Sequence, residues 1–156
     1  MLYGLLVLVH IIGVLGFVAT HGVSMVIGFK VRKEGDPKTV ALLIALSRST
    51  FNYMYAFTLI LLAGGISAGF VGHLWGTGWM WTALVLLVLI FGYMSAVPAP
   101  FYGKLRQAAE IESSGGSPIP GQDLVSLRVS KIPTVTSVIG IVGLALIAWL
   151  MVMKPY

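Results

Sequence analysis

The sequence predicts an all-α protein built as a bundle of four transmembrane helices. Of its 156 residues, 58% are hydrophobic and only 10% are charged, whereas soluble domains carry about 25% charged residues. A mean hydropathy of +0.96 is far above what a water-soluble domain shows. Four separate stretches are each long enough for a membrane-spanning helix, which needs about 20 apolar residues. We therefore expect one integral membrane domain over residues 1–156.

The four predicted spans cover residues 2–29, 50–71, 79–101 and 133–153. The first is too long for the apolar core of a signal peptide, and no charged segment precedes it, so we interpret it as an uncleaved span. The second apolar stretch contains Arg48, whose charge is costly near the bilayer centre, so the crossing is placed after it. Pro98 and Pro100 predict a kink or an end of the third span, and Pro133 suits the first turn of the fourth.

The distribution of charge predicts the orientation of the chain. Lys and Arg gather in the predicted loops 30–49 and 102–132, while the loop between the second and third spans has none. Positively charged loops stay in the cytoplasm, so both the N- and the C-terminus are expected outside. The net charge of +5 is explained by these loops, and the expected partner is the lipid bilayer rather than nucleic acid. No acidic residue lies in a predicted span, which argues against a carboxylate-based proton relay.

Two histidines of the first span, in "HIIGVLGFVATH", are the candidate functional residues. On a helix of 3.6 residues per turn, His10 and His21 share one face, together with Gly13, Phe17, Ser24 and Gly28. Eleven residues correspond to a rise of about 16 Å, so the two rings lie at different depths and cannot both bind one metal ion from a straight helix. The glycines of this face would let a helix or a flat cofactor come close.

An imidazole in an apolar slot is typical of an axial ligand to haem iron. His10 and His21 are therefore candidate cofactor-binding and metal-binding residues, and Arg48 is a candidate partner for a haem propionate or a lipid headgroup. Other candidates for the propionates are Lys104, Arg128 and Lys131. A second axial ligand could be His73 of the outer loop or one of the methionines in or near the spans, namely Met25, Met54, Met80 and Met94. The alternative is that both span histidines only form hydrogen bonds between helices.

The absence of other motifs narrows the chemistry. The chain has no cysteine, which excludes disulfides, thiolate metal sites and iron–sulfur clusters. No phosphate-binding glycine motif is present, and the glycines of "AGGISAG" at residues 63–69 are typical of tight helix packing.

Four segments of the chain resemble the HemJ-like membrane proteins. They are "LVHIIGV" in the first span, "HLWGTGWMW" leading into the third, "RVSKIPTV" opening the fourth and "MKPY" at the end. The resemblance points to the superfamily of four-helix bacterial membrane proteins that also holds the CopD-like copper resistance proteins, and to an uncharacterised branch of it. It implies haem b in the bacterial cytoplasmic (inner) membrane, with His10 matching a histidine regarded as a haem ligand. The lysine that the HemJ-like family uses early in the third span is absent, because that region reads Trp81, Thr82, Ala83.

We therefore expect an integral membrane b-type haem protein with a redox role, either electron transfer or oxidoreduction of a porphyrin or a quinone. Its partner would be one of these molecules or a redox partner protein, and no catalytic residue is identified. One alternative is a copper or other small-solute transport protein, because His and Met suit copper. Another is a structural membrane subunit without a cofactor. Small membrane proteins often associate, so a homo-oligomer is compatible with the sequence.

Overall fold

The computed structural model describes residues 1–155, and within that range the chain is helical with short connections. Tyr156, the last residue of the MKPY segment, lies outside the described residues. The elements are α1 (Leu2–Lys33), α2 (Pro37–Ser49), α3 (Phe51–Val71), the 3₁₀ turn η1 (Leu74–Gly76), α4 (Gly78–Ala96), α5 (Pro98–Ser113), α6 (Leu124–Arg128) and α7 (Ile132–Met153). The described part of the chain contains no strand, so the predicted all-α class is confirmed.

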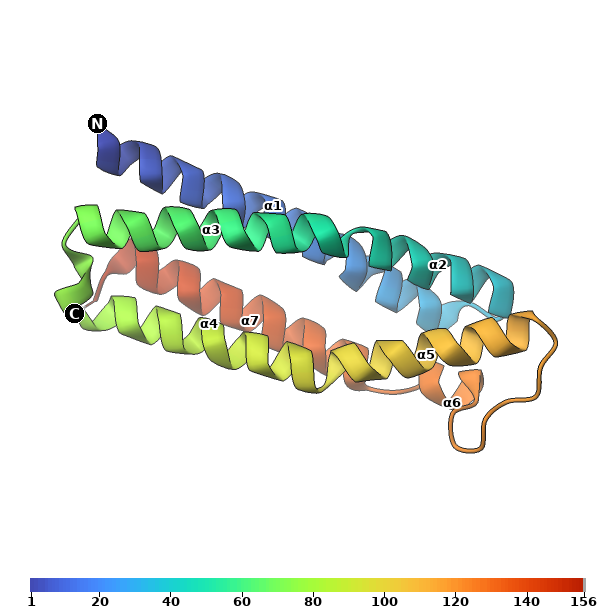
Figure 1. Cartoon of the computed structure of the whole chain (residues 1–156). Helices are drawn as coiled ribbons and strands as arrows, with labels where there is room; N and C mark the ends of the chain where they lie inside the picture. Colours follow the sequence, from blue (N-terminus) through green and yellow to red (C-terminus); the bar gives the residue numbers. More distant parts are fainter. Residues whose placement is uncertain (156) are drawn as a thin grey trace.

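Four helical columns are long and apolar enough to cross a membrane. They are α1 alone, α2 with α3, α4 with α5, and α6 with α7. The columns run side by side, and both termini lie at the same end of the bundle (Figure 1). The four-span fold predicted from hydropathy is thus confirmed, and an even number of crossings accounts for the common end of the termini.

The helices extend beyond the predicted spans at the end of the bundle away from the termini. Helix α1 continues to Lys33, and most of the segments expected as loops 30–49 and 102–132 is helical, in α2, α5 and α6. Asp36 starts α2 because its carboxylate accepts hydrogen bonds from the backbone N–H groups of Lys38 (3.4 Å) and Thr39 (2.9 Å), the usual role of an N-cap residue. Hydropathy alone does not predict α2, α5 and α6 as helices, since their surfaces are polar.

Prolines divide two of the columns where the sequence predicts. Helix α4 ends at Ala96 and α5 begins at Pro98, because proline lacks the N–H that would continue the hydrogen-bond ladder. Pro133 lies in the first turn of α7, where its missing N–H costs nothing.

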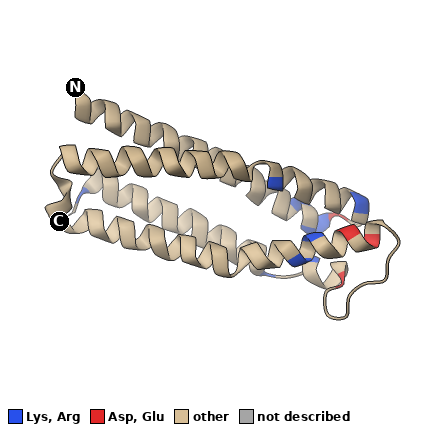
Figure 2. Cartoon of the chain, in the orientation of Figure 1, with Lys and Arg blue, Asp and Glu red and all other residues tan. Residues whose placement is uncertain are grey.

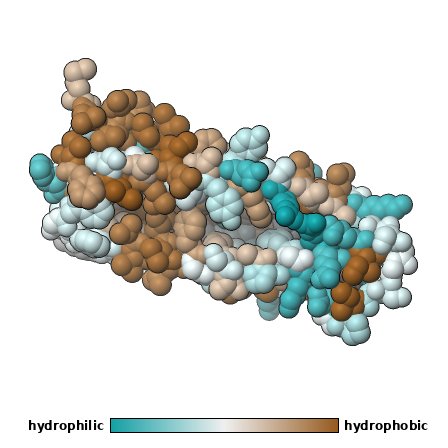
Figure 3. Space-filling view, in the orientation of Figure 1, coloured by the Kyte–Doolittle hydropathy of each residue, from teal (hydrophilic) through white to brown (hydrophobic). Residues whose placement is uncertain are grey.

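The charged end of the bundle has its own apolar core. Side chains of α1, α2, α5 and α6 form it, with Val31, Val40, Leu105 and Leu124 almost fully buried. Nearly all charged residues surround this core (Figure 2), and the surface changes from apolar to hydrophilic along the bundle (Figure 3). The excess of basic residues predicts that this end faces the cytoplasm.

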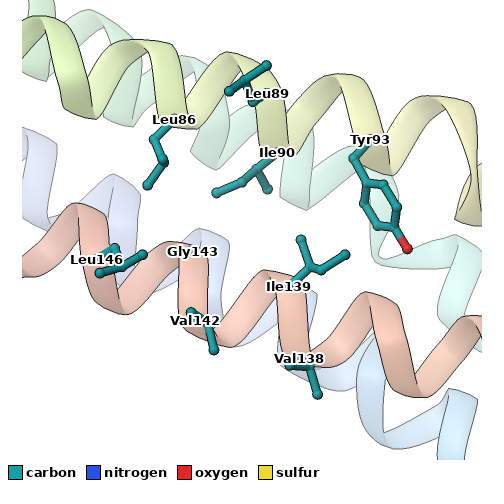
Figure 4. A pocket seen from close by; sticks show the side chains of 9 residues that line it. All are labelled: Leu86, Leu89, Ile90, Tyr93, Val138, Ile139, Val142, Gly143 and Leu146. Carbon is teal, nitrogen blue, oxygen red and sulfur yellow. The ribbon is translucent and has the colours of Figure 1, made fainter.

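In the apolar half, the helices pack as two pairs, α1 with α3 and α4 with α7. The second pair meets at Trp79, Ala83, Ile147 and Leu150. A shallow hollow of about 410 Å³ also lies between α4 and α7, and its lining side chains are apolar except for Tyr93 (Figure 4). The Tyr93 hydroxyl lies 3.4 Å from Thr136 Oγ1, so this hollow offers no unpaired polar group to a ligand.

Candidate functional site

The ring of His10 is oriented by a hydrogen bond across the first helix pair. Its Nδ1 lies 2.6 Å from the main-chain carbonyl oxygen of Leu61 on α3. A carbonyl oxygen can only accept, so Nδ1 carries the hydrogen and, in the neutral ring, Nε2 carries the lone pair. Metal-ligating histidines are commonly oriented by such a bond from the other ring nitrogen. The helix–helix hydrogen bond that the sequence allows is therefore present, and it leaves Nε2 free to bind a ligand.

Two glycines of α3 make room for His10. A Cβ atom on Gly64 would lie 2.6 Å from the backbone nitrogen of His10, and one on Gly65 would lie 2.8 Å from its Nδ1. Real Cβ atoms do not approach this closely, so a side chain at Gly64 would push against the backbone of α1 and one at Gly65 would displace the His10 ring. The tight helix packing predicted from "AGGISAG" is confirmed, and its purpose at Gly65 is to seat the imidazole.

His10 lies on the wall of an apolar cavity between the two helix pairs. The cavity has a volume of about 490 Å³ and is lined from α1, α3, η1, α4 and α7. This size falls in the range of about 300–1,000 Å³ that is typical of ligand pockets. Several lining residues on α1 and α7 are also exposed on the outer surface, among them Leu15 and Val152. The cavity is therefore bordered by lipid-facing side chains.

One indole nitrogen close to the cavity is buried without a hydrogen-bond partner among the described residues. Trp75 of η1 lines the cavity, and its Nε1 is buried with no hydrogen-bond acceptor among residues 1–155. A Cβ atom on Gly69, one turn after Gly65 on α3, would lie 3.2 Å from this nitrogen. A buried N–H that lacks an acceptor is unfavourable, and this nitrogen packs against α3 at Gly69 rather than opening onto the cavity.

These residues suit the apolar body of a haem. The wall is almost entirely hydrocarbon, one imidazole faces it, and two thioethers, of Met80 and Met151, lie on it. Thioether sulfur is a known axial ligand. Of the four methionines proposed from the sequence, only Met80 lines the cavity. Met151, in the last turn of α7, also lines the cavity. Nothing in the local sequence distinguishes it from the other apolar residues of the fourth span.

His21 lies elsewhere. It shares the helix face of His10 but not its cavity; its ring stacks on Phe17 with centroids 5.6 Å apart. On the other side, its Nε2 would lie 3.6 Å from a Cβ on Gly140 of α7. The structure thus separates the two histidines into two environments, as the spacing along α1 predicts.

Arg48 and His73 are likewise apart from the cavity. Arg48 is exposed near the end of α2, 13 residues before Leu61, which corresponds to about 20 Å along the helices. Its neighbours Ser47 and Thr50 bond to Ser24 of α1, at 3.1 and 3.3 Å, and this fixes the junction of α2 and α3. His73 is exposed, has a left-handed backbone (φ 52°) and caps η1.

A metal site of the carboxylate or multi-histidine kind is not assembled. No group of three or more His, Cys, Asp or Glu side chains comes together anywhere in the part of the chain that the structure describes. A metal at His10 would therefore need other ligands, such as thioether sulfur or the nitrogens of a macrocycle.

Fold and cavity together define a polytopic integral membrane protein with an apolar site inside its bundle. Residues 4–155 match the family described as predicted integral membrane protein (DUF2269), and the chain belongs to that family. No curated protein and no solved structure matches the chain. The family match establishes the membrane class, and it carries no assignment to the HemJ-like or CopD-like proteins.

Proposed function

We propose that the protein is a b-type haem protein of the bacterial cytoplasmic membrane, with His10 as an axial ligand. The observation that carries this proposal is the hydrogen bond from His10 Nδ1 to Leu61 O, because it leaves Nε2 as the coordinating atom at an apolar cavity. The resemblance of "LVHIIGV" to the HemJ-like proteins supports the same residue.

Met80 and Met151 are the candidates for the second axial position, because both line the cavity with His10. When bound, the haem would supply a one-electron redox centre, and the chain would hold it in a water-poor environment. Since lipid-facing residues border the cavity, the exchange partner proposed is a membrane-soluble quinone or porphyrin, or a membrane-bound redox protein. His21 and Arg48 do not lie at this cavity, and we assign them no part in holding the haem there.

The test is the visible spectrum of protein purified in detergent after expression with haem available. A Soret band and a positive pyridine haemochrome assay are expected. His10→Ala should lose most of the band, while the matched control His73→Ala should retain it. A colourless wild-type protein would refute the proposal, and a full band in His10→Ala would remove His10 as the ligand.

Copper binding is a second candidate, because His10, Met80 and Met151 line one cavity and thioether with imidazole suits Cu(I). Metal analysis of the same preparation separates the two candidates. Stoichiometric copper without a Soret band would favour transport or handling of copper. Neither copper nor haem would favour a structural subunit.

A further inference from the structure

We infer that the inner half of the bundle holds a binding site for a single Cu(I) ion, with Nε2 of His21 and the thioether of Met94 as its ligands. The site lies where α1, α4 and α7 meet, outside the cavity that His10 lines. It does not depend on haem at His10, and it gives His21, which the proposed haem site leaves unused, a function of its own.

His21 is an unpaired imidazole inside a membrane span. Its ring is half-buried and stacks on Phe17, but neither ring nitrogen forms a hydrogen bond with any group among residues 1–155. The His10 ring, by contrast, bonds to Leu61 O. Neither nitrogen of His21 is among the fully enclosed polar atoms of the described residues, so each retains surface that a ligand can reach. A histidine within a span is typical of ion pathways and functional sites, because it is costly without a partner.

Gly140 of α7 brings this ring together with a thioether of α4. A Cβ atom at Gly140 would lie 3.6 Å from His21 Nε2 and 3.4 Å from the methyl carbon Cε of Met94. Both distances are ordinary van der Waals contacts, and no other side chain lies within 4 Å of that point among the described residues. A space of the size of a methyl group therefore lies over Gly140, bounded by the imidazole nitrogen and by the Met94 side chain.

The two bounding groups suit Cu(I) better than other ions. Thioether sulfur selects Cu(I), and imidazole binds it as well. Zn²⁺ is almost always held by four ligands, and Mg²⁺ and Ca²⁺ require oxygen ligands. No group of three His, Cys, Asp or Glu side chains comes together within residues 1–155, and the acidic residues lie at the charged end of the bundle (Figure 2). A single positive charge also costs less to remove from water than the two of a divalent ion.

Titration of the full chain in detergent with Cu(I) tests the site. Competition with the chromophoric chelator bicinchoninate, under ascorbate, gives the affinity and the stoichiometry, and the chain has no cysteine to compete. In Gly140→Ala the new methyl group fills the space at ordinary contact distances, so the variant should fold normally. It should bind Cu(I) at least about 10-fold more weakly, since even partners outside the ligand shell change metal affinity by about 10- to 100-fold. His21→Phe and Met94→Leu should show a similar loss. The matched controls are Gly92→Ala, at an open position, and His73→Phe, at an exposed histidine.

X-ray absorption at the copper edge should show both nitrogen and sulfur around the ion in the wild-type chain. No Cu(I) binding by the wild-type chain, or a ligand shell without sulfur, would overturn the inference, and neither result depends on a variant folding. Full affinity in Gly140→Ala would overturn it too. Copper that is lost in His10→Ala but kept in His21→Phe would belong to the cavity and not to this site. Because Cu(I) gives no Soret band, the haem proposal is decided separately by the visible spectrum.

Discussion

Gly65 of α3 lies directly against the imidazole of His10, so that a Cβ atom on the glycine would come within 2.8 Å of Nδ1 and 3.0 Å of Cε1. The ring is thereby held between the glycine and the Leu61 carbonyl oxygen. The position of His10 Nε2, the proposed coordinating atom, thus depends on Gly65, a residue that has no side chain and acts only by leaving room for the ring.

The variant Gly65→Ala should therefore disturb the proposed haem site while leaving the protein folded. The added methyl group must displace the His10 ring or lengthen its bond to Leu61, so we expect a weaker or shifted Soret band. Gly92→Ala is the control, because a Cβ there meets nothing within 4 Å. Identical spectra for the two variants would show that the seating of His10 by Gly65 is unimportant.

Gly13 is expected to be essential for the packing of α1 on α3. A Cβ at this position would overlap the backbone of Leu61, which cannot yield as a flexible side chain could. Gly13→Val should lower the free energy of unfolding by about 1–3 kcal/mol, the usual cost of overpacking. Thermal unfolding in detergent measures the effect, with the open position Gly22 as the matched site on the same helix. Equal stability of Gly13→Val and Gly22→Val would contradict this account of the helix pair.

Replacement of His21 should spare the proposed haem at His10. Its ring stacks on Phe17 and lies near Gly140, outside the cavity that His10 lines. His21→Phe retains a flat ring of similar size, so we expect an unchanged Soret band together with normal folding. If this variant lost the band while His10→Ala kept it, the ligand would have to be reassigned to His21.

The first turn of α2 should become less protected in acid. The hydroxyl and the backbone N–H of Thr39 bond to the Asp36 carboxylate and lower its pKa below the usual 3.8. A lowered pKa in the folded state means that the cap is fully effective above about 3.8 and is lost as the pH falls through the lower folded value. Hydrogen exchange of the α2 amides from pH 6 downward measures this, after correction for the intrinsic rate. Asp36→Asn, which caps without titrating, should remove the pH dependence, and an identical pH profile in that variant would rule out Asp36 as its cause.

The sequence by itself determined the membrane class, the four spans and the ends of the helices at proline. Each of these depends on local composition: a run of apolar residues must avoid water wherever it lies in the fold, and proline lacks the same N–H in every context. The common face of His10 and His21 on α1 also follows from helical geometry alone. The amphipathic inner helices were not predicted, because α2 and α5 owe their order to the apolar core that they share.

Only the tertiary structure decided what each candidate residue meets. The hydrogen-bond partner of a ring nitrogen and the lining of a cavity both depend on which helix lies opposite. That neighbour comes from a segment far away in the chain. Leu61 is 51 residues from His10, so no local pattern shows that its carbonyl oxygen accepts the hydrogen of the ring. For the same reason Arg48, a candidate partner for a haem propionate or a lipid headgroup, lies away from His10, whereas His10, Met80 and Trp75 line one cavity.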